Sequence, residues 1–275
     1  MDGVTETRIG TSGWAYPEWR GTFYPPELAQ RRELEHLSRT VNSVELNNSF
    51  YALPKSSSFR RWREQTPDDF VFAVKGGRFI THVKKLREVR TPLANFFASG
   101  VLDLGPKLGP LLWQLPPSMP LDADRLIAFL TLLPHSTSAA AELAAEHDER
   151  MSDRASTSFD TDRPLRHTVE ARHPSFHDQV FTELLREHGI GLVVADSAGT
   201  WVQLDDVTAD FAYVRLHGDA ELYASGYPTE SLRRWADRVR TWRDGGTDSY
   251  IYFDNSMNAH APHDAVALAA LLDAG

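Results

Sequence analysis

The chain has 275 residues, of which 41% are hydrophobic, with a formal net charge of -9 at pH 7 and no cysteine. The missing cysteines exclude disulfides and thiolate chemistry, and the acidic balance argues against nucleic-acid or anionic-membrane binding through a basic surface. No apolar run approaches the roughly 20 residues that cross a bilayer, and residues 1–8 do not resemble a secretory signal. We therefore expect a cytoplasmic protein that does not bind membranes.

Eight short segments have strand-like composition, several with alternating apolar and polar residues. Residues 70–74 form a continuous apolar run, which is typical of a parallel strand covered on both faces. The predicted strands are 8–13, 43–47, 70–75, 109–115, 165–172, 191–196, 211–218 and 249–255.

Helix-like segments separate most of these strands, with apolar residues at helical spacing. The predicted helices are 27–38, 57–65, 92–101, 122–133, 177–187, 231–242 and 262–272, with no convincing helix in 197–210. Residues 135–163 are rich in small and charged residues, and we interpret them as an insertion or mobile excursion within one domain.

The alternation of strands and helices predicts a single-domain TIM-type (β/α)8 barrel. An open doubly wound sheet is the alternative, but it would need a glycine-rich phosphate loop after an early strand, and the sequence has none. In a barrel the outer strand face must be apolar, so Glu45 and Asn47 are expected to point inward. Active sites of such barrels lie at the carboxyl ends of the strands.

Every predicted strand ends in polar or ionisable groups, and four of these are our catalytic candidates. Glu45 and Glu170 suit acid/base work as a carboxylate pair, unless arginines simply neutralise them. His217 is a candidate base, and Lys75 is a candidate charge partner, anion contact or, less favoured, Schiff-base lysine.

Basic residues near the strand ends predict a pocket for a small anionic ligand. Aromatic residues in the loops predict either a hydrophobic cap or a stacking wall for a sugar or a base. The expected ligand contacts are Trp14, Asn47, Tyr51, His82, Gln114, Arg172, Arg215, Tyr223, Asp254 and Asn255. No short metal-ligand motif is present, so the sequence does not identify a cofactor, and a divalent metal held by carboxylates and histidines stays an alternative.

Several motifs resemble the YecE-like family, long labelled domain of unknown function 72. They cover nearly the whole chain and are Gly10–Trp14, Phe23–Pro25, Glu45–Asn47, Phe72–Lys75, Gln114–Pro117, Val169–His173, Tyr213–Gly218 and Tyr252–Asn255. The resemblance implies a TIM-like barrel, but it implies no activity because the family has no settled one. Ala171, Phe176, Asp254 and His260 depart from the residues that are commoner in the family.

Three functions therefore stay open. The first is an enzyme, such as a hydrolase, lyase or isomerase, that acts on a small polar, anionic or sugar-like substrate by acid/base chemistry. The second is a metal-dependent nucleic-acid-processing barrel, which rests on fold analogy alone and is disfavoured by the net charge. The third is a non-catalytic ligand-binding module. The oligomeric state is not predicted.

Overall fold

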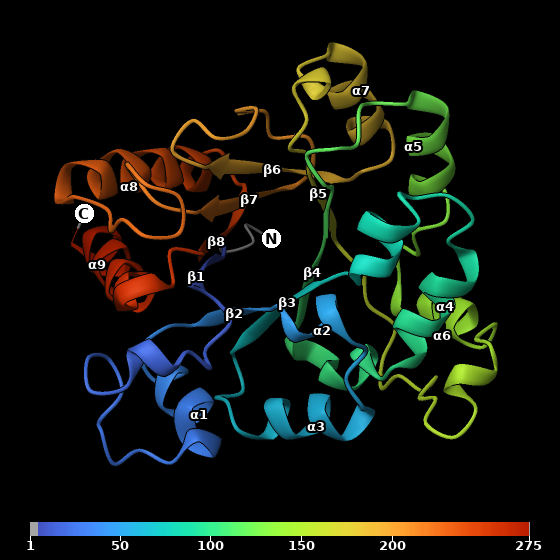
Figure 1. The fold of residues 1–275 in the computed structure, drawn as a ribbon, viewed down its shortest axis with the longest axis horizontal. Helices are drawn as coiled ribbons and strands as arrows, with labels where there is room; N and C mark the ends of the chain where they lie inside the picture. The colour runs from blue at the N-terminus through green and yellow to red at the C-terminus, as the bar shows by residue number, and fades with distance from the viewer. Residues whose placement is uncertain (1–4, 275) are drawn as a thin grey trace.

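The computed structural model describes residues 5–274, and its centre is a closed parallel barrel of eight strands in chain order (Figure 1). Each strand pairs with the next, and β8 pairs with β1. This confirms the predicted TIM-type barrel. The strands are β1 Thr7–Ser12, β2 Ser43–Leu46, β3 Val71–Lys75, β4 Leu108–Gln114, β5 His167–Glu170, β6 Gly191–Asp196, β7 Phe211–Leu216 and β8 Asp248–Phe253.

In β3, β4, β6, β7 and β8, alternate residues belong to two separate apolar clusters, as the two-residue period of a strand requires. Outward residues such as Phe72 and Val74 pack with the surrounding helices, whereas Ala73 packs with Tyr213 and Tyr252 inside the barrel. The side chains that point into the barrel become polar toward the carboxyl ends of the strands. This change from apolar to polar side chains places the candidate site at the carboxyl end of the barrel.

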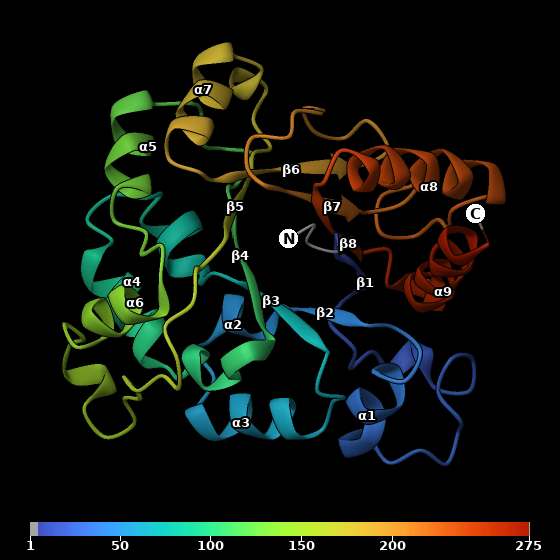
Figure 2. The same cartoon turned by 180° about the vertical axis from the view of Figure 1, so that it is seen from behind.

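Helices surround the strands in both views (Figures 1 and 2). Most of the predicted helices are present, and their ends differ from the predicted ones by a few residues. The helices are α1 Glu33–Leu37, α2 Asn48–Tyr51, α3 Ser56–Glu64, α4 Arg90–Ala98, α5 Ala123–Leu130, α6 Thr137–Ala144, α7 Gln179–Glu187, α8 Thr229–Asp244 and α9 His260–Asp273. Within residues 5–274, no helix is both long and apolar enough to cross a membrane.

Two helix predictions need correction. The predicted helix 27–38 is regular only in α1, because Ala29 is extended (ψ 135°) and only a 3-10 turn, Gln30–Arg32, precedes it. The sequence did not predict α2, a single turn that follows β2 directly. The expected lack of a helix between β6 and β7 is confirmed.

Residues 135–163 pack onto the outer layer of the barrel. Their helix α6 lies beside α4 in both views. Ser156 N donates to Ala98 O at 2.8 Å, and Glu146 forms an ion pair with Arg90. These contacts make the segment part of the helical layer, and its interpretation as an insertion remains a prediction.

Candidate functional site

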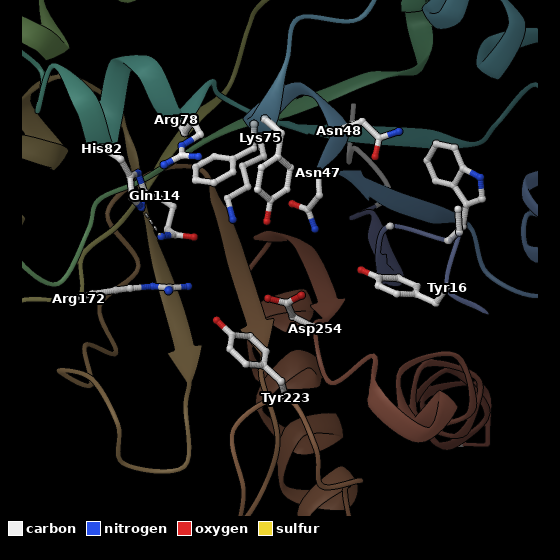
Figure 3. Close-up of a pocket in the computed structure, with 15 residues that line it drawn as sticks. Tyr16, Asn47, Asn48, Lys75, Arg78, His82, Gln114, Arg172, Tyr223 and Asp254 are labelled. Carbon is white, nitrogen blue, oxygen red and sulfur yellow. Dashed lines mark hydrogen bonds between the residues drawn. The ribbon is translucent and has the colours of Figure 1, made fainter. Parts of the chain in front are cut away.

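A cavity of about 600 Å³ opens at the carboxyl ends of the strands (Figure 3). Residues from the ends of β2 to β5 and β8 and from the loops after β1, β2, β3 and β7 line it. Of the residues predicted from the sequence, the cavity brings together Trp14, Asn47, Tyr51, Lys75, His82, Gln114, Arg172, Tyr223 and Asp254. Glu45, Glu170, Arg215, His217 and Asn255 do not line it.

The end of β3 approaches its neighbour so closely that glycine is required after Lys75. A Cβ atom on Gly76 would lie 2.2 Å from the buried ring of Trp113. The next residue, Gly77, has much more space, since its Cβ would come no nearer than 3.7 Å to Ser49 O. The chain then enters a π-helical turn, Phe79–Val83, which carries His82 to the cavity wall.

A buried ionic network lies beneath the cavity, with Arg215 at its centre. Arg215 Nε donates to Glu45 Oε2 at 3.0 Å and Nη2 to Glu45 Oε1 at 2.9 Å. Nη1 donates to Glu170 Oε2 at 2.6 Å, and Nη2 also donates to Asp254 Oδ2 at 2.9 Å. One guanidinium therefore binds three carboxylates, from β2, from β5 and from the residue just after β8.

Glu45 and Glu170 are bound by protein partners beneath the cavity and do not line it. Both side chains are fully buried, as is Arg215. Glu45 also accepts hydrogen bonds from Ser12 Oγ at 2.5 Å and from Tyr213 OH at 2.7 Å. Arg215 and the two glutamates are shielded from the cavity by protein partners. Their roles as an anion contact and as reacting carboxylates therefore stay predictions, which this arrangement does not favour.

The arginines keep the carboxylates of the network ionised. Burial alone would raise the pKa of Glu170, but Arg172 and Arg215 outweigh it and lower the pKa below the ordinary range. For Asp254, burial is likewise outweighed, by Arg215 and then His217, and the pKa falls to about 2. Both groups carry a negative charge at neutral pH.

His217 is a buried and neutral part of the same network. Burial and then Arg215 lower its pKa. Its Nε2 lies 3.4 Å from Arg215 Nη1, and its Nδ1 lies 3.0 Å from Asp254 Oδ2 but outside the angular range of a hydrogen bond. Because an arginine N–H can only donate, Nε2 accepts from Arg215, and the proton of the neutral ring is assigned to Nδ1. The expectation that His217 acts on a substrate as a base does not fit its position behind Asp254.

Asn255 serves the fold rather than the cavity. It is fully buried, and its Nδ2 donates to Ser225 O at 2.9 Å and to Asp264 Oδ2 at 2.8 Å. The amide is thus directed at the outer helical layer next to α9, and the predicted role of Asn255 in ligand binding stays a prediction that this position does not favour.

Three cations face the cavity. Lys75 is 8% exposed, and its Nζ lies 4.5 Å from the centre of the Phe50 ring. Within residues 5–274, neither Lys75 nor Arg78 has a carboxylate within 4 Å. Arg172 donates from Nε to Glu170 at 2.6 Å and stacks on Trp201 at 3.5 Å, which holds its guanidinium in place.

The environment of Lys75 also changes its protonation. Burial first, and then the charge of Arg215, lower the pKa of Lys75 from 10.5 to about 8. The nearby carboxylates oppose this shift without cancelling it. Lys75 is therefore mostly charged at pH 7 but loses its proton far more readily than an ordinary lysine.

His82 and Gln114 form a neutral pair on the same wall as Lys75. Burial, followed by Lys75 and Arg172, lowers the pKa of His82 to about 4. His82 Nδ1 lies 2.9 Å from Thr81 Oγ1, and Nε2 lies 3.4 Å from Gln114 Nε2. If the amide donates to Nε2, the side-chain carbonyl of Gln114 is left for the cavity, into which Figure 3 shows it pointing.

Asp254 is the acidic group of the cavity. Its Oδ2 is bound by Arg215, whereas Oδ1 has no hydrogen-bond partner among residues 5–274. Figure 3 shows the Asn47 amide and the Tyr223 hydroxyl directed toward the same space. Asn47 Oδ1 is buried without a partner, and Tyr51 stands at the rim with 74% of its surface exposed.

Sequence reasoning missed several contributors to this site. Arg78 and Asn48 line the cavity, and Trp201 positions Arg172 from the long connection between β6 and β7. Asn48 directly follows the predicted ligand contact Asn47, and Arg78 lies three residues after Lys75. Their closeness to the ends of β2 and β3 is the feature of the sequence that could have identified them. No such signal marks Trp201.

The carboxylates of the network do not form a metal site. Within residues 5–274, no group of three or more histidine, aspartate or glutamate side chains is arranged to hold a metal ion. The carboxylates of Glu45, Glu170 and Asp254 converge on Arg215, whose guanidinium takes the place that a cation would need. We therefore derive no chemical step from a metal.

A family model described as "Protein of unknown function DUF72" matches residues 8–275. The UPF0759 protein YecE of Escherichia coli K12 is 30% identical over 195 residues, which cover 69% of this chain and 58% of that protein. The UPF0759 protein YunF of Bacillus subtilis 168 is 30% identical over 114 residues, covering 40% of this chain and 39% of YunF. This chain thus matches less than two thirds of the length of each relative.

A solved structure extends this likeness over the whole fold. A DUF72 family protein from Thermotoga maritima MSB8 has a TM-score of 0.76 and 25% sequence identity, and the match covers 98% of this chain and 99% of that one. The names of these three relatives state no activity.

Proposed function

The chain belongs to the DUF72 family, and from that premise we propose that it is an enzyme that binds a small anionic substrate at the carboxyl end of the barrel. Its acid/base group is Lys75. The observation that carries the proposal is the charge of the cavity wall: in the described part of the chain, neither Lys75 nor Arg78 has a carboxylate within 4 Å, and Arg172 is paired with Glu170 alone.

Lys75 has the properties that general acid/base catalysis needs. Proton transfer is most efficient when the pKa of the group lies near the working pH, and burial brings the pKa of Lys75 to about 8. In its charged form the ammonium binds an anion, and it can donate a proton to an atom that becomes basic. Its neutral form can take a proton from a substrate.

Asp254 complements Lys75 as a fixed negative group. Because its pKa is about 2, it stays ionised and is a weak base. Its free Oδ1 is suited to accept a hydrogen bond from a substrate hydroxyl. Arg215 and His217 act as positioning residues, since they contact Asp254 from beneath and contact no open space.

A binding and turnover screen tests this proposal. We expect inorganic phosphate and small phosphorylated or carboxylated metabolites to raise the melting temperature of the wild type. Lys75→Met should lower the affinity for those anions by about tenfold, the size expected for a lost charge-assisted contact. Lys55→Met is the matched control, because Lys55 is exposed and outside the cavity.

Compounds that bind are then incubated with the protein, and products are followed by NMR. Turnover that is lost in Lys75→Met but kept in Lys55→Met supports the enzyme. A wild type that no anion stabilises would overturn the anion site. Tight binding without turnover of any compound in the screen would instead favour a ligand-binding module.

A further inference from the structure

We propose that the substrate class is a monosaccharide phosphate, with the phosphate on the wall formed by β3 to β5 and the sugar ring against the loops after β1 and β2. This inference deepens the proposed function and rests on it. It follows from the unequal chemistry of the two sides of one cavity (Figure 3).

The cationic wall has the charge of a phosphate site. Lys75 and Arg78 together bring two positive charges, neither with a carboxylate within 4 Å among residues 5–274, and Arg172 adds a guanidinium that is only partly used by Glu170. A phosphate monoester carries about -1.5 to -2 charges at pH 7. A carboxylate carries a single charge, so two free cations match the phosphate better. Arginine also binds phosphate oxygens through paired N–H groups.

The opposite wall offers aromatic surface instead of charge. Trp14 lines the cavity, and its ring is braced edge-on by Trp62, with ring centres 5.6 Å apart and an interplanar angle of 79°. Tyr16 packs on Trp19 at 4.8 Å, and its hydroxyl is already used in a 2.5 Å bond to Ser12 O. Both residues therefore present fixed, largely apolar ring surface to a ligand, which suits the C–H face of a sugar.

Uncharged and acidic groups stand between these walls. Asn47 and Asn48 supply amides beside the aromatic rings, and Asp254 Oδ1 is an acceptor without a protein partner in residues 5–274. A ring that carries several hydroxyls can donate to the carboxylate and accept from the amides. An apolar anion would leave these polar groups desolvated and unpaired, at a cost in affinity.

The size of the cavity fits this class of ligand. Binding sites for small molecules enclose about 300–1,000 Å³, and this cavity has about 600 Å³. Inorganic phosphate alone would fill only the cationic side. The ring of a pentose or hexose phosphate would reach the aromatic side as well, so both walls contribute to affinity only when phosphate and sugar are joined.

Isothermal titration calorimetry at pH 7.5 tests the inference with defined probes. These are glucose 6-phosphate, ribose 5-phosphate, glucose, ribose, inorganic phosphate and glucuronate. We expect at least one of the two sugar phosphates to bind about tenfold more tightly than inorganic phosphate, and the free sugars and glucuronate to bind more weakly than that sugar phosphate.

Variants separate the two walls. Trp14→Leu should weaken the sugar phosphate about tenfold, the size of one lost stacking contact, and leave inorganic phosphate unchanged. Arg78→Ala should weaken both ligands. Asn48→Ala tests the aromatic side at an exposed position and keeps the test valid if Trp14→Leu fails to fold. Trp242→Leu and Arg233→Ala, both on α8 and outside the cavity, are the matched controls.

The results distinguish this inference from the proposed function. If inorganic phosphate binds through Arg78 but neither sugar phosphate binds more tightly, the sugar assignment is overturned and the anion site stands. Equal affinity for glucuronate and the sugar phosphates would overturn the phosphate assignment. If no anion binds to the wild type at all, the proposed function fails first.

Discussion

Arg215 and Glu45 form a buried, two-pronged ion pair, with Nε–Oε2 and Nη2–Oε1 distances of 3.0 and 2.9 Å. Neither side chain is exposed to solvent. The pair joins β7 to β2 across the inside of the barrel, so its strength depends on barrel closure. It also forms the floor beneath Asp254 and thereby connects the stability of the fold to the geometry of the site.

Replacing Arg215 should destabilise the protein strongly. Arg215→Met leaves Glu45 and Glu170 buried without their common cation, and loss of one partner from a buried ion pair costs about 3–5 kcal/mol. Urea unfolding at pH 7 measures the change in the free energy of unfolding. Arg186→Met is the control, because its ion pair with Asp206 is exposed and should contribute less than about 1 kcal/mol. Equal effects of the two substitutions would contradict a central role for Arg215.

Two adjacent glycines should respond very differently to alanine. In Gly76→Ala the new methyl group would lie 2.2 Å from the Trp113 ring, which is fully buried and packed against Phe96 and Phe129. Overpacking of this kind costs about 1–3 kcal/mol or more. Gly77→Ala meets only Ser49 O at 3.7 Å, so its effect should stay within about 0.5 kcal/mol. Thermal unfolding of both variants checks the order, and equally small effects would show that the strand end is loosely packed.

Lys75 should make stability rise with pH in the alkaline range. The pKa of Lys75 is about 8 in the folded protein and 10.5 ordinarily, so between these values the unfolded chain binds more protons. The free energy of unfolding, taken as wild type minus Lys75→Met, should therefore be flat below pH 8. It should then increase by up to about 3 kcal/mol toward pH 10.5.

Urea unfolding at several pH values between 7 and 10 measures this difference. Lys55→Met, with an exposed lysine, serves as the comparison, and its difference from the wild type should not change across the same range. A wild-type advantage over Lys75→Met that shrinks as the pH rises from 8 to 10 would show that burial does not dominate the environment of Lys75.

His82 should stay neutral far below the ordinary histidine range. Burial, Lys75 and Arg172 lower its pKa to about 4, so the unfolded chain takes up this proton first as the pH falls through 6.5. The contribution of His82 to stability is thus present above pH 6.5 and is lost between 6.5 and 4. NMR titration of the imidazole signals, with His82→Gln to assign the resonance, should find a midpoint near 4. A midpoint near 6.5 would mean that the histidine is hydrated and uncoupled from the cations.

Local pattern in the sequence was enough to predict the barrel and the end of the barrel that carries the site. Alternation along Tyr213, Arg215 and His217 placed these residues on the inside, because a strand has a period of two wherever it lies. Listing the strand ends then found Lys75, Gln114, Arg172 and Asp254, since parallel strands present their carboxyl ends on one face. These inferences need only neighbours along the chain.

Depth within the barrel was decided by the tertiary structure alone. Residues two positions apart on a strand occupy successive layers, so Arg215 is buried beneath the cavity while Asp254, just after β8, reaches its surface. The sequence also could not predict the ion pairs. The carboxylates of Glu45, Glu170 and Asp254 all bind the guanidinium of Arg215, whereas none of the three lies within 4 Å of Lys75. The charge of each residue and the periodicity of each strand follow from the sequence alone. Which charged side chains form ion pairs depends on how the eight strands are staggered around the closed barrel.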